Sequence, residues 1–287
     1  MMRHVLLLFI MILCGHFTLY SQEENKMEIP FKKGVLKICS IKRIIVNGYE
    51  GETIIIKKLN QKTQTDTTNN VAINDTLRQS TTYLEVKETT KGLQKVTINS
   101  DDEFPLKIEQ KDRFLTISDD YSKNLESYVE TKGYEILIPN SIDLIWTIGD
   151  CKSDTLDFVG EEKPCELNNF SGEAEISSAL YHFKITDVKG PLSINTIGGD
   201  VIIIFKTILP TNLYSVYSDN GAIDVTLPET SNINIASSSI NFYSNINFDI
   251  TSKKQLNRAL KMNLKLGTGK AQMILATNIG DIFLRKL

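Results

Sequence analysis

Few residues of this chain combine the types and the spacing that catalysis or metal binding requires. The sequence contains three histidines, of which His4 and His16 lie in the N-terminal segment and His182 is the only other one. A zinc site built from clustered histidines, or a Ser-His-Asp triad, would therefore depend on His182. His182 opens a segment of alternating apolar residues, so we expect a half-exposed strand residue there. The sequence also lacks a Gly-x-Ser-x-Gly nucleophile elbow.

The segment Gly-Thr-Gly-Lys at 267–270 has the composition of a phosphate-binding loop. A P-loop needs a further glycine upstream at a fixed spacing, and a Ser or Thr after the lysine to hold magnesium. The upstream glycine is missing, and Ala271 stands where the hydroxyl residue would be. We therefore predict a turn between strands.

Acidic residues offer a second route to chemistry, because two carboxylates at a suitable separation can hydrolyse glycosides. Asp200 and Asp281, however, follow glycines at expected turns, where Asp caps the local backbone. The acidic clusters at 101–103 and 119–120 match neither an EF-hand loop nor a calcium-binding Gly-Gly-x-Gly-x-Asp repeat, and we expect solvated loops. The sequence thus predicts a protein that is not an enzyme, with no catalytic residue, metal or cofactor.

The elements that carry these residues follow a nine-residue step, in which apolar residues sit two positions apart. Side chains of a strand alternate between its faces, so this spacing predicts strands with one buried face. Segments open at Glu173, His182, Pro191 and Asp200, after a longer joint at 206–212 again at Leu213, Ala222, Ser231 and Ile240, and finally at Met262, Ala271 and Asp281. The segment 201–205 is apolar at every position and is predicted to be a central strand covered on both faces.

Turns between these segments contain small and polar residues that tolerate positive φ or bond to the local backbone. The predicted structural turn residues are Gly172, Gly190, Gly199, Asp200, Gly221, Gly280 and Asp281. The even step favours an all-β fold, a β-solenoid in which short strands stack coil on coil. An antiparallel β-sandwich or meander is the alternative.

The N-terminal end has the features of a secretory signal peptide. A short polar start precedes a continuous apolar run at 5–13, which is too short to span a bilayer, and Ser21 offers a small residue before the expected cleavage point. Cys14 suggests a lipoprotein, but Leu13 stands where a small residue normally precedes the acylated cysteine. Removal of residues 1–21 would leave 287 − 21 = 266 residues.

The exported chain is predicted to have two regions. Residues 22–165 form an N-terminal β region that caps the repeat and contains a polar loop at 60–82, and residues 166–287 form the repeat. Within the first region, strands at 34–45 and 52–57 flank a glycine-rich turn and are expected to form a hairpin. Trp146, the only tryptophan, is expected in a core strand.

Three cysteines remain after export, and an oxidising compartment permits a bridge between two of them. Cys151 and Cys165 are the predicted pair, because they would close a short loop, whereas Cys39 lies in an alternating strand and is expected to be a buried small hydrophobic residue. Three Asp-Thr-apolar or Asp-Thr-Thr segments resemble O-glycan acceptor motifs, with Thr67, Thr76 and Thr155 as the candidate acceptors.

Charge excludes one class of partner. The formal net charge is −3, with 32 Lys and Arg against 35 Asp and Glu, and the two signs are interspersed. Nucleic acid is therefore not expected as a partner, because phosphate backbones require a basic stripe.

Four stretches resemble the DUF4097-type, adhesin-like β-strand-repeat family of Gram-negative cell envelopes. They are 44–56 (IIVNGYEGETIII), the strand 134–139 that ends in proline, the turn 197–201 and 277–286 (TNIGDIFLRK). The family's turns usually read Asn-Gly-Asp, and here they read Gly-Gly-Asp, Asn-Gly-Ala and Ile-Gly-Asp, so the glycine is kept. The resemblance implies an exported β-solenoid and carries over no catalytic residue.

Together these features predict an exported, non-enzymatic β-repeat protein that presents a surface for binding or for envelope structure. Its partner would be an envelope protein or a glycan, its contact with membranes only peripheral, and its location the periplasm or the outer-membrane periphery. Two alternatives are a carbohydrate-active enzyme on a β-helix, of polysaccharide lyase or glycosidase type, and a periplasmic signalling or chaperone partner with an unpaired strand edge.

Overall fold

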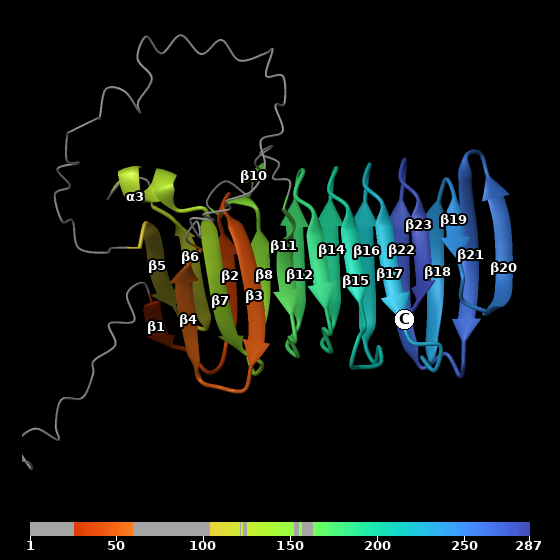
Figure 1. Ribbon diagram of the computed structural model, residues 1–287, viewed down its shortest axis with the longest axis horizontal. Coiled ribbons are helices and arrows are strands. Elements are labelled where there is room, and N and C mark those ends of the chain that lie inside the picture. Colours follow the sequence, from red (N-terminus) through yellow and green to blue (C-terminus); the bar gives the residue numbers. More distant parts are fainter. Residues whose placement is uncertain (1–25, 60–103, 121, 123–124, 152–154, 157–162) are drawn as a thin grey trace, which may run out of the picture.

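The computed structural model describes residues 26–59, 104–120, 122, 125–151, 155–156 and 163–287. Within them the chain is almost entirely β-structure, arranged as two large sheets that face each other along an elongated body (Figure 1). The expected signal peptide, Cys14 and the polar loop 60–82 lie outside the described residues. Among the residues described, no helix is long and apolar enough to cross a bilayer, and α3 (Leu125–Glu130) has six residues.

Both sheets are mixed, and we call them sheet A and sheet B. Sheet A has ten strands in the order β1 (Lys26–Pro30), β4 (Thr53–Lys58), β7 (Gly133–Pro139), β3 (Arg43–Tyr49), β11 (Cys165–Asn168), β13 (Phe183–Thr186), β15 (Val201–Ile204), β17 (Ile223–Leu227), β23 (Ile282–Lys286) and β19 (Phe242–Ser244). Sheet B has eleven strands in the order β20 (Asp249–Leu256), β21 (Ala259–Leu266), β18 (Ile233–Ser239), β22 (Ala271–Thr277), β16 (Leu213–Ser218), β14 (Leu192–Thr196), β12 (Ala174–Ser178), β8 (Asp143–Thr147), β2 (Val35–Cys39), β6 (Phe114–Asp119) and β5 (Leu106–Lys111). A short pair, β9 (Gly149–Asp150) with β10 (Thr155–Leu156), lies apart from both.

The nine-residue step appears as an alternation between the sheets. From β11 to β17 successive strands belong to sheet A and sheet B in turn, and each pairs in parallel with the next strand of its own sheet. Cys165 pairs with Phe183 and Phe183 with Val201, so one passage through both sheets takes 18 residues. Apolar side chains two apart on each strand therefore meet the opposite sheet and form the core.

At both ends of the body the strands stand out of chain order. The last two strands, β22 and β23, lie between β16 and β18 in sheet B and between β17 and β19 in sheet A (Figure 1). At the other end, β2 lies between β8 and β6 in sheet B, and β3 lies between β7 and β11 in sheet A. Segments far apart in sequence thus hold each end together.

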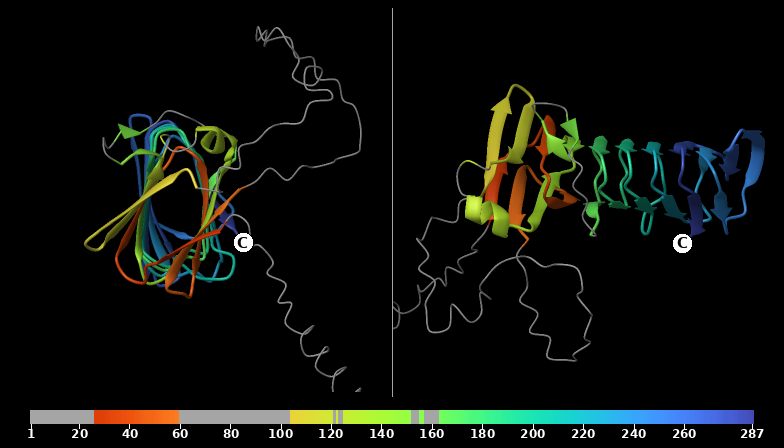
Figure 2. Two further views of the ribbon diagram at one scale, coloured as in Figure 1. Left: turned by 90° about the vertical axis from the view of Figure 1, so that its left-hand side faces the viewer. Right: turned by 90° about the horizontal axis from the view of Figure 1, so that it is seen from above.

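Antiparallel pairs complete each sheet. The hairpin of β20 and β21 extends sheet B by two strands beyond β18, whereas sheet A ends at β19 (Figure 1). The pairs β5–β6 and β1–β4 end the sheets at the other side (Figure 2).

A single hydrophobic cluster fills the space between the sheets, with members from Phe31 to Leu284. Trp146 is fully buried in β8 and meets Phe183 of the other sheet edge to face, with ring centroids 5.6 Å apart, which confirms its expected place in a core strand. The prediction that 201–205 is covered on both faces is wrong, because Ile202 is 39% exposed on the outer face of sheet A. The segment 201–205 is apolar throughout because its core face and its solvent face both carry apolar residues: Val201 and Ile203 are buried, whereas Ile202 is exposed.

The predicted hairpin of the first two strand segments is also wrong. The stretch 34–45 divides into β2 and the start of β3, and β3 and β4 do not pair with each other. Strand β7 lies between them, parallel to β3 and antiparallel to β4. The turn at 50–52 connects strands that a later segment separates, which no local signal in the sequence reveals.

The turns require glycine because neighbouring turns approach each other too closely for a side chain, not because the backbone has positive φ. None of the five predicted turn glycines has positive φ, but a Cβ at Gly199, Gly221 or Gly280 would overlap the carbonyl oxygen of the residue stacked beside it. Hydroxyl side chains bind the turns together. Ser218 Oγ accepts from the N–H of Gly221 at 2.8 Å and donates to the carbonyl of Gly199 at 3.1 Å, and Thr277 repeats this between Gly280 and Gly221.

Candidate functional site

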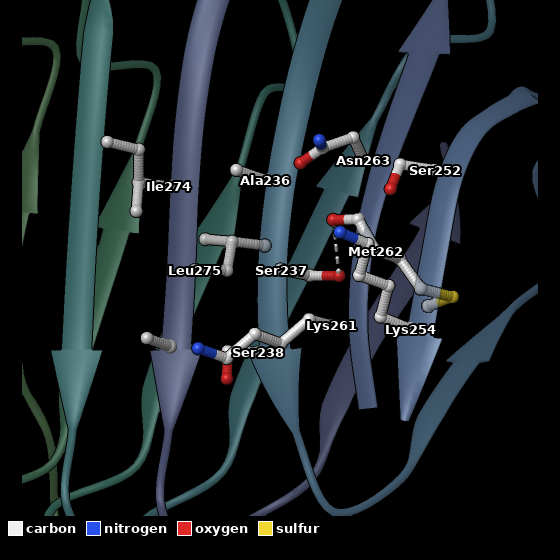
Figure 3. Close-up of a pocket in the computed structure, with 11 residues that line it drawn as sticks. Ala236, Ser237, Ser238, Ser252, Lys254, Lys261, Met262, Asn263, Ile274 and Leu275 are labelled. Atoms are coloured by element: carbon white, nitrogen blue, oxygen red, sulfur yellow. Dashed lines mark hydrogen bonds between the residues drawn. The ribbon is translucent and has the colours of Figure 1, made fainter. Parts of the chain in front are cut away.

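The outer face of sheet B is hollowed near the C-terminal end of the body, over strands β18, β20, β21 and β22 (Figure 3). We call this site the C-terminal hollow, and it has a volume of about 340 Å³. Side chains that face outward around it are Ala236, Ser238, Ser252, Lys254, Lys261, Asn263, Ile274 and Ala276. Buried Ser237, Met262 and Leu275 point the other way, so their backbone forms the floor.

Strand register places these side chains in two neighbouring rows across the sheet. Ile274, Ala236 and Asn263 are successive cross-strand partners in the first row. The second row consists of Ala276, Ser238, Lys261 and Lys254. Because β18 contributes only the short side chains of Ala236 and Ser238 to the hollow, the surface is low at this part of β18 and higher over the strands on either side.

Two lysines from neighbouring strands line the hollow, and neither has an acidic partner among the residues that the structure describes. Lys254 and Lys261 are direct partners across the antiparallel pair β20–β21, and both are exposed. In the part of the chain that the structure describes, neither forms an ion pair or a side-chain hydrogen bond. Figure 3 shows Lys261 extending from β21 across β18 towards Ser238. Like charges directly opposite each other destabilise a sheet, so this pair costs stability unless an anion lies between them.

The whole β20–β21 hairpin is basic. Residues 249–266 contain Lys253, Lys254, Arg258, Lys261 and Lys265 against Asp249 alone, a formal charge of 5 − 1 = +4 in a protein of net charge −3. Lysines on an edge strand also protect it from pairing with other chains, and β20 is such a strand. Lys261 lies on the inner strand of the hairpin, where edge protection does not account for it.

The lining suits binding better than acid–base chemistry. It offers two ammonium groups, two hydroxyls, one amide and an apolar side chain in Ile274, which is 46% exposed. It contains no carboxylate, imidazole or thiol. Among the described residues, no group of three or more His, Cys, Asp or Glu side chains is placed to hold a metal ion.

The residues that the sequence singled out lie elsewhere, along the turns at the edges of the sheets. Asp200 Oδ1 accepts a hydrogen bond from the N–H of Ala222 at 2.8 Å, and Asp281 Oδ1 accepts one from Asn241 Nδ2 at 2.9 Å. His182 Nδ1 accepts the N–H of Asp200 at 3.1 Å, and its side chain is 41% exposed. Each contact joins a turn to the turn stacked beside it, so these polar groups fasten neighbouring turns.

The predicted disulfide between Cys151 and Cys165 is wrong, because Cys151 is bonded to Cys39, with Cα atoms 5.4 Å apart. Strand β2 pairs with β8 so that Cys39 lies opposite Thr147, four residues before Cys151. Cys165 is fully buried and faces the core from sheet A. Cys39 is buried as expected, but as half of a cystine on the outer face of sheet B.

The candidate glycan acceptors and the segment 267–270 complete the predicted positions. Thr67 and Thr76 lie outside the described residues, and Thr155 lies in β10. The segment 267–270 is the turn between β21 and β22, as predicted, with positive φ of 61° at Gly267 and 72° at Gly269.

Asp119 departs from the expected solvated loop. Its carboxylate accepts hydrogen bonds from Ser40 Oγ at 2.8 Å and from the backbone N–H of Ile41 at 2.9 Å. Burial raises the pKa of Asp119 above its ordinary value, and these hydrogen bonds together with Lys42 counteract only part of the rise. The charge at Asp119 also raises the pKa of the buried Tyr134, for which burial is the larger cause.

This raised pKa predicts a distinctive pH dependence of stability. The folded protein holds a proton on Asp119 more tightly than the unfolded chain, so the contribution of Asp119 is most favourable below the unfolded pKa of about 3.9 and is lost as the pH rises through the folded value. We expect wild type to gain stability relative to Asp119→Asn as the pH falls from neutral, measured by urea unfolding of both proteins. Ser40→Ala removes a donor to the carboxylate and should steepen the effect. Parallel pH profiles of wild type and Asp119→Asn would contradict the assignment.

Sequence reasoning did not find the C-terminal hollow. The sequence does contain features that could have indicated this site, because basic residues outnumber acidic ones in 249–266 and serines occupy 237–239. That Ile274 and Ala236 are neighbours could not be predicted from the sequence, because it depends on β22 pairing with β18 out of chain order.

Comparison with known proteins adds two distant structural similarities. No protein-family model matches the chain, and no curated protein matches it by sequence. A candidate cell adhesion protein from Clostridium sporogenes aligns at 13% identity and a TM-score of 0.41, over 91% of this chain and 99% of that one. A candidate adhesin from Bacteroides fragilis aligns at 12% identity and a TM-score of 0.32, over 90% of this chain and 95% of its own. At these TM-scores neither similarity assigns a function, and membership of the DUF4097-type family stays a prediction.

Proposed function

We propose that this chain is an exported β-solenoid that acts without catalysis, as a binding scaffold of the cell envelope. The observation that carries the proposal is the stacked parallel register from β11 to β17, in which each coil repeats the last through both sheets. Such a body holds its outer faces rigid over a long distance, which suits presentation of a surface.

Two further features support the proposal. A disulfide between residues 112 positions apart is a bond that forms and persists in oxidising compartments, which fits export. The C-terminal hollow carries cationic, hydroxyl and apolar groups without the converging acids and bases of a hydrolase or lyase. This arrangement favours binding over the carbohydrate-active enzyme.

Location and binding can be tested in one experiment. The full chain is produced in a Gram-negative host, the cells are fractionated, and the purified protein is titrated onto isolated envelopes and then recovered by sedimentation. We expect the protein in the periplasmic or outer-membrane fraction and saturable binding to envelopes that heat-unfolded protein lacks. Recovery only from cytoplasm or medium, absence of saturable binding, or release of cleaved polysaccharide would each overturn the proposal.

A further inference from the structure

The C-terminal hollow has the chemistry of a site for a small anionic sugar. We propose that it binds a carboxylate-bearing saccharide, with Lys254 and Lys261 holding the carboxylate and the apolar side chains of the hollow receiving a sugar ring. The inference names a ligand class for the proposed binding scaffold and rests on it.

The charge argument begins with the lysine pair. Lys254 and Lys261 are cross-strand partners at the edge of the hollow, and the structure shows no acid beside either within its described residues. A carboxylate placed between two ammonium groups can accept a charge-assisted hydrogen bond from each, which relieves their mutual repulsion. The surplus of positive charge on the β20–β21 hairpin would also attract an anionic ligand from solution.

The remaining lining fits a saccharide better than a bare anion. Ile274, Ala236 and Ala276 give an apolar surface for the C–H face of a sugar ring. Ser238, Ser252 and Asn263 supply donors and acceptors at its rim that match hydroxyl groups. A volume of about 340 Å³ is at the small end of ligand sites, so the ligand would be a short saccharide or the end of a longer one.

The same hairpin provides a matched control. Lys253 lies one residue from Lys254 but pairs with buried Met262, so it stands on the opposite face of the hairpin. Lys253→Gln and Lys261→Gln remove the same charge from the same hairpin. A general attraction to the basic hairpin would weaken in both variants, whereas a site in the hollow would respond only to Lys261→Gln.

The test is a calorimetric titration of the purified full chain with trigalacturonate, maltotriose and inorganic phosphate at physiological salt, with phosphatidylglycerol vesicles as a fourth probe. We expect trigalacturonate to bind best, Lys261→Gln to weaken it about tenfold and Lys253→Gln to leave it within about twofold. Ala236→Phe, which fills the hollow without a change of charge, should also abolish binding. Circular dichroism and thermal unfolding of each variant show that it is folded.

Four results would overturn the inference. They are equal binding of maltotriose, binding of phosphate as tight as that of trigalacturonate, equal losses in Lys253→Gln and Lys261→Gln, or binding to the vesicles alone. If Lys261→Gln still binds isolated envelopes as wild type does, the hollow is not the binding surface, and the scaffold function stands without it. If wild type binds no envelopes at all, the proposed function fails first.

Discussion

Replacing Gly199 with alanine is expected to destabilise the protein severely, by about 3 kcal/mol or more. A Cβ at this position would overlap the carbonyl oxygen of Tyr181 and lie 2.5 Å from its carbonyl carbon. Both atoms belong to the backbone of the turn stacked beside Gly199, so no side chain can rotate away to make room. Relief would require the two turns to separate, which breaks hydrogen bonds between them such as the one from the N–H of Gly198 to the Ala179 carbonyl.

The neighbouring glycine makes the test specific. A Cβ at Gly198 would come too close only to the Cδ2 atom of Leu180, at 2.8 Å, and would lie at an ordinary contact distance of 3.7 Å from the Ala179 carbonyl oxygen. Leu180 is 37% exposed, so its side chain can move. Gly198→Ala should therefore change the free energy of unfolding by no more than about 0.5 kcal/mol. Urea unfolding of the two variants beside wild type measures the contrast. Similar stabilities of Gly198→Ala and Gly199→Ala would show that close stacking of turns is not what requires glycine at 199.

The strands of the repeat could be predicted because their signal is local. Side chains such as Leu192 and Ile194 alternate with polar residues, and the period of two is visible without knowledge of any partner strand. The turn glycines were visible for the same reason. The physical reason for glycine was not visible, because whether Gly199 needs positive φ or empty space depends on the turn stacked beside it.

What could not be predicted is the pairing at the two ends. Strand β7 separates β3 from β4, and β22 separates β16 from β18, although nothing in the composition of these strands distinguishes them from their neighbours. The C-terminal hollow and the cystine both follow from such pairings. Cys39 and Cys151 approach each other because β2 and β8 are adjacent in sheet B, a contact between segments more than 100 residues apart.

Loss of this cystine is the second change with a large expected effect. The double variant Cys39→Ser, Cys151→Ser is expected to lose about 4 to 5 kcal/mol of stability, because the bond closes a loop of more than 100 residues and restricts the unfolded chain accordingly. The loop predicted from the sequence, between Cys151 and Cys165, would be much shorter and worth about 3 kcal/mol in the same treatment.

Two measurements separate these pairings. Peptide mapping of the unreduced protein is expected to recover one linked peptide that contains Cys39 and Cys151. Cys165→Ala should leave that linkage intact, because Cys165 is buried in the core and takes no part in the bond. A linked peptide containing Cys165, or a double variant as stable as wild type, would contradict the assignment.

The bond also ties the segment after β8 to the outer face of β2, one of the strands that stand out of chain order. Its removal should therefore loosen the N-terminal end of the body first, seen as faster amide hydrogen exchange in β2 and β8 than in β14 and β16.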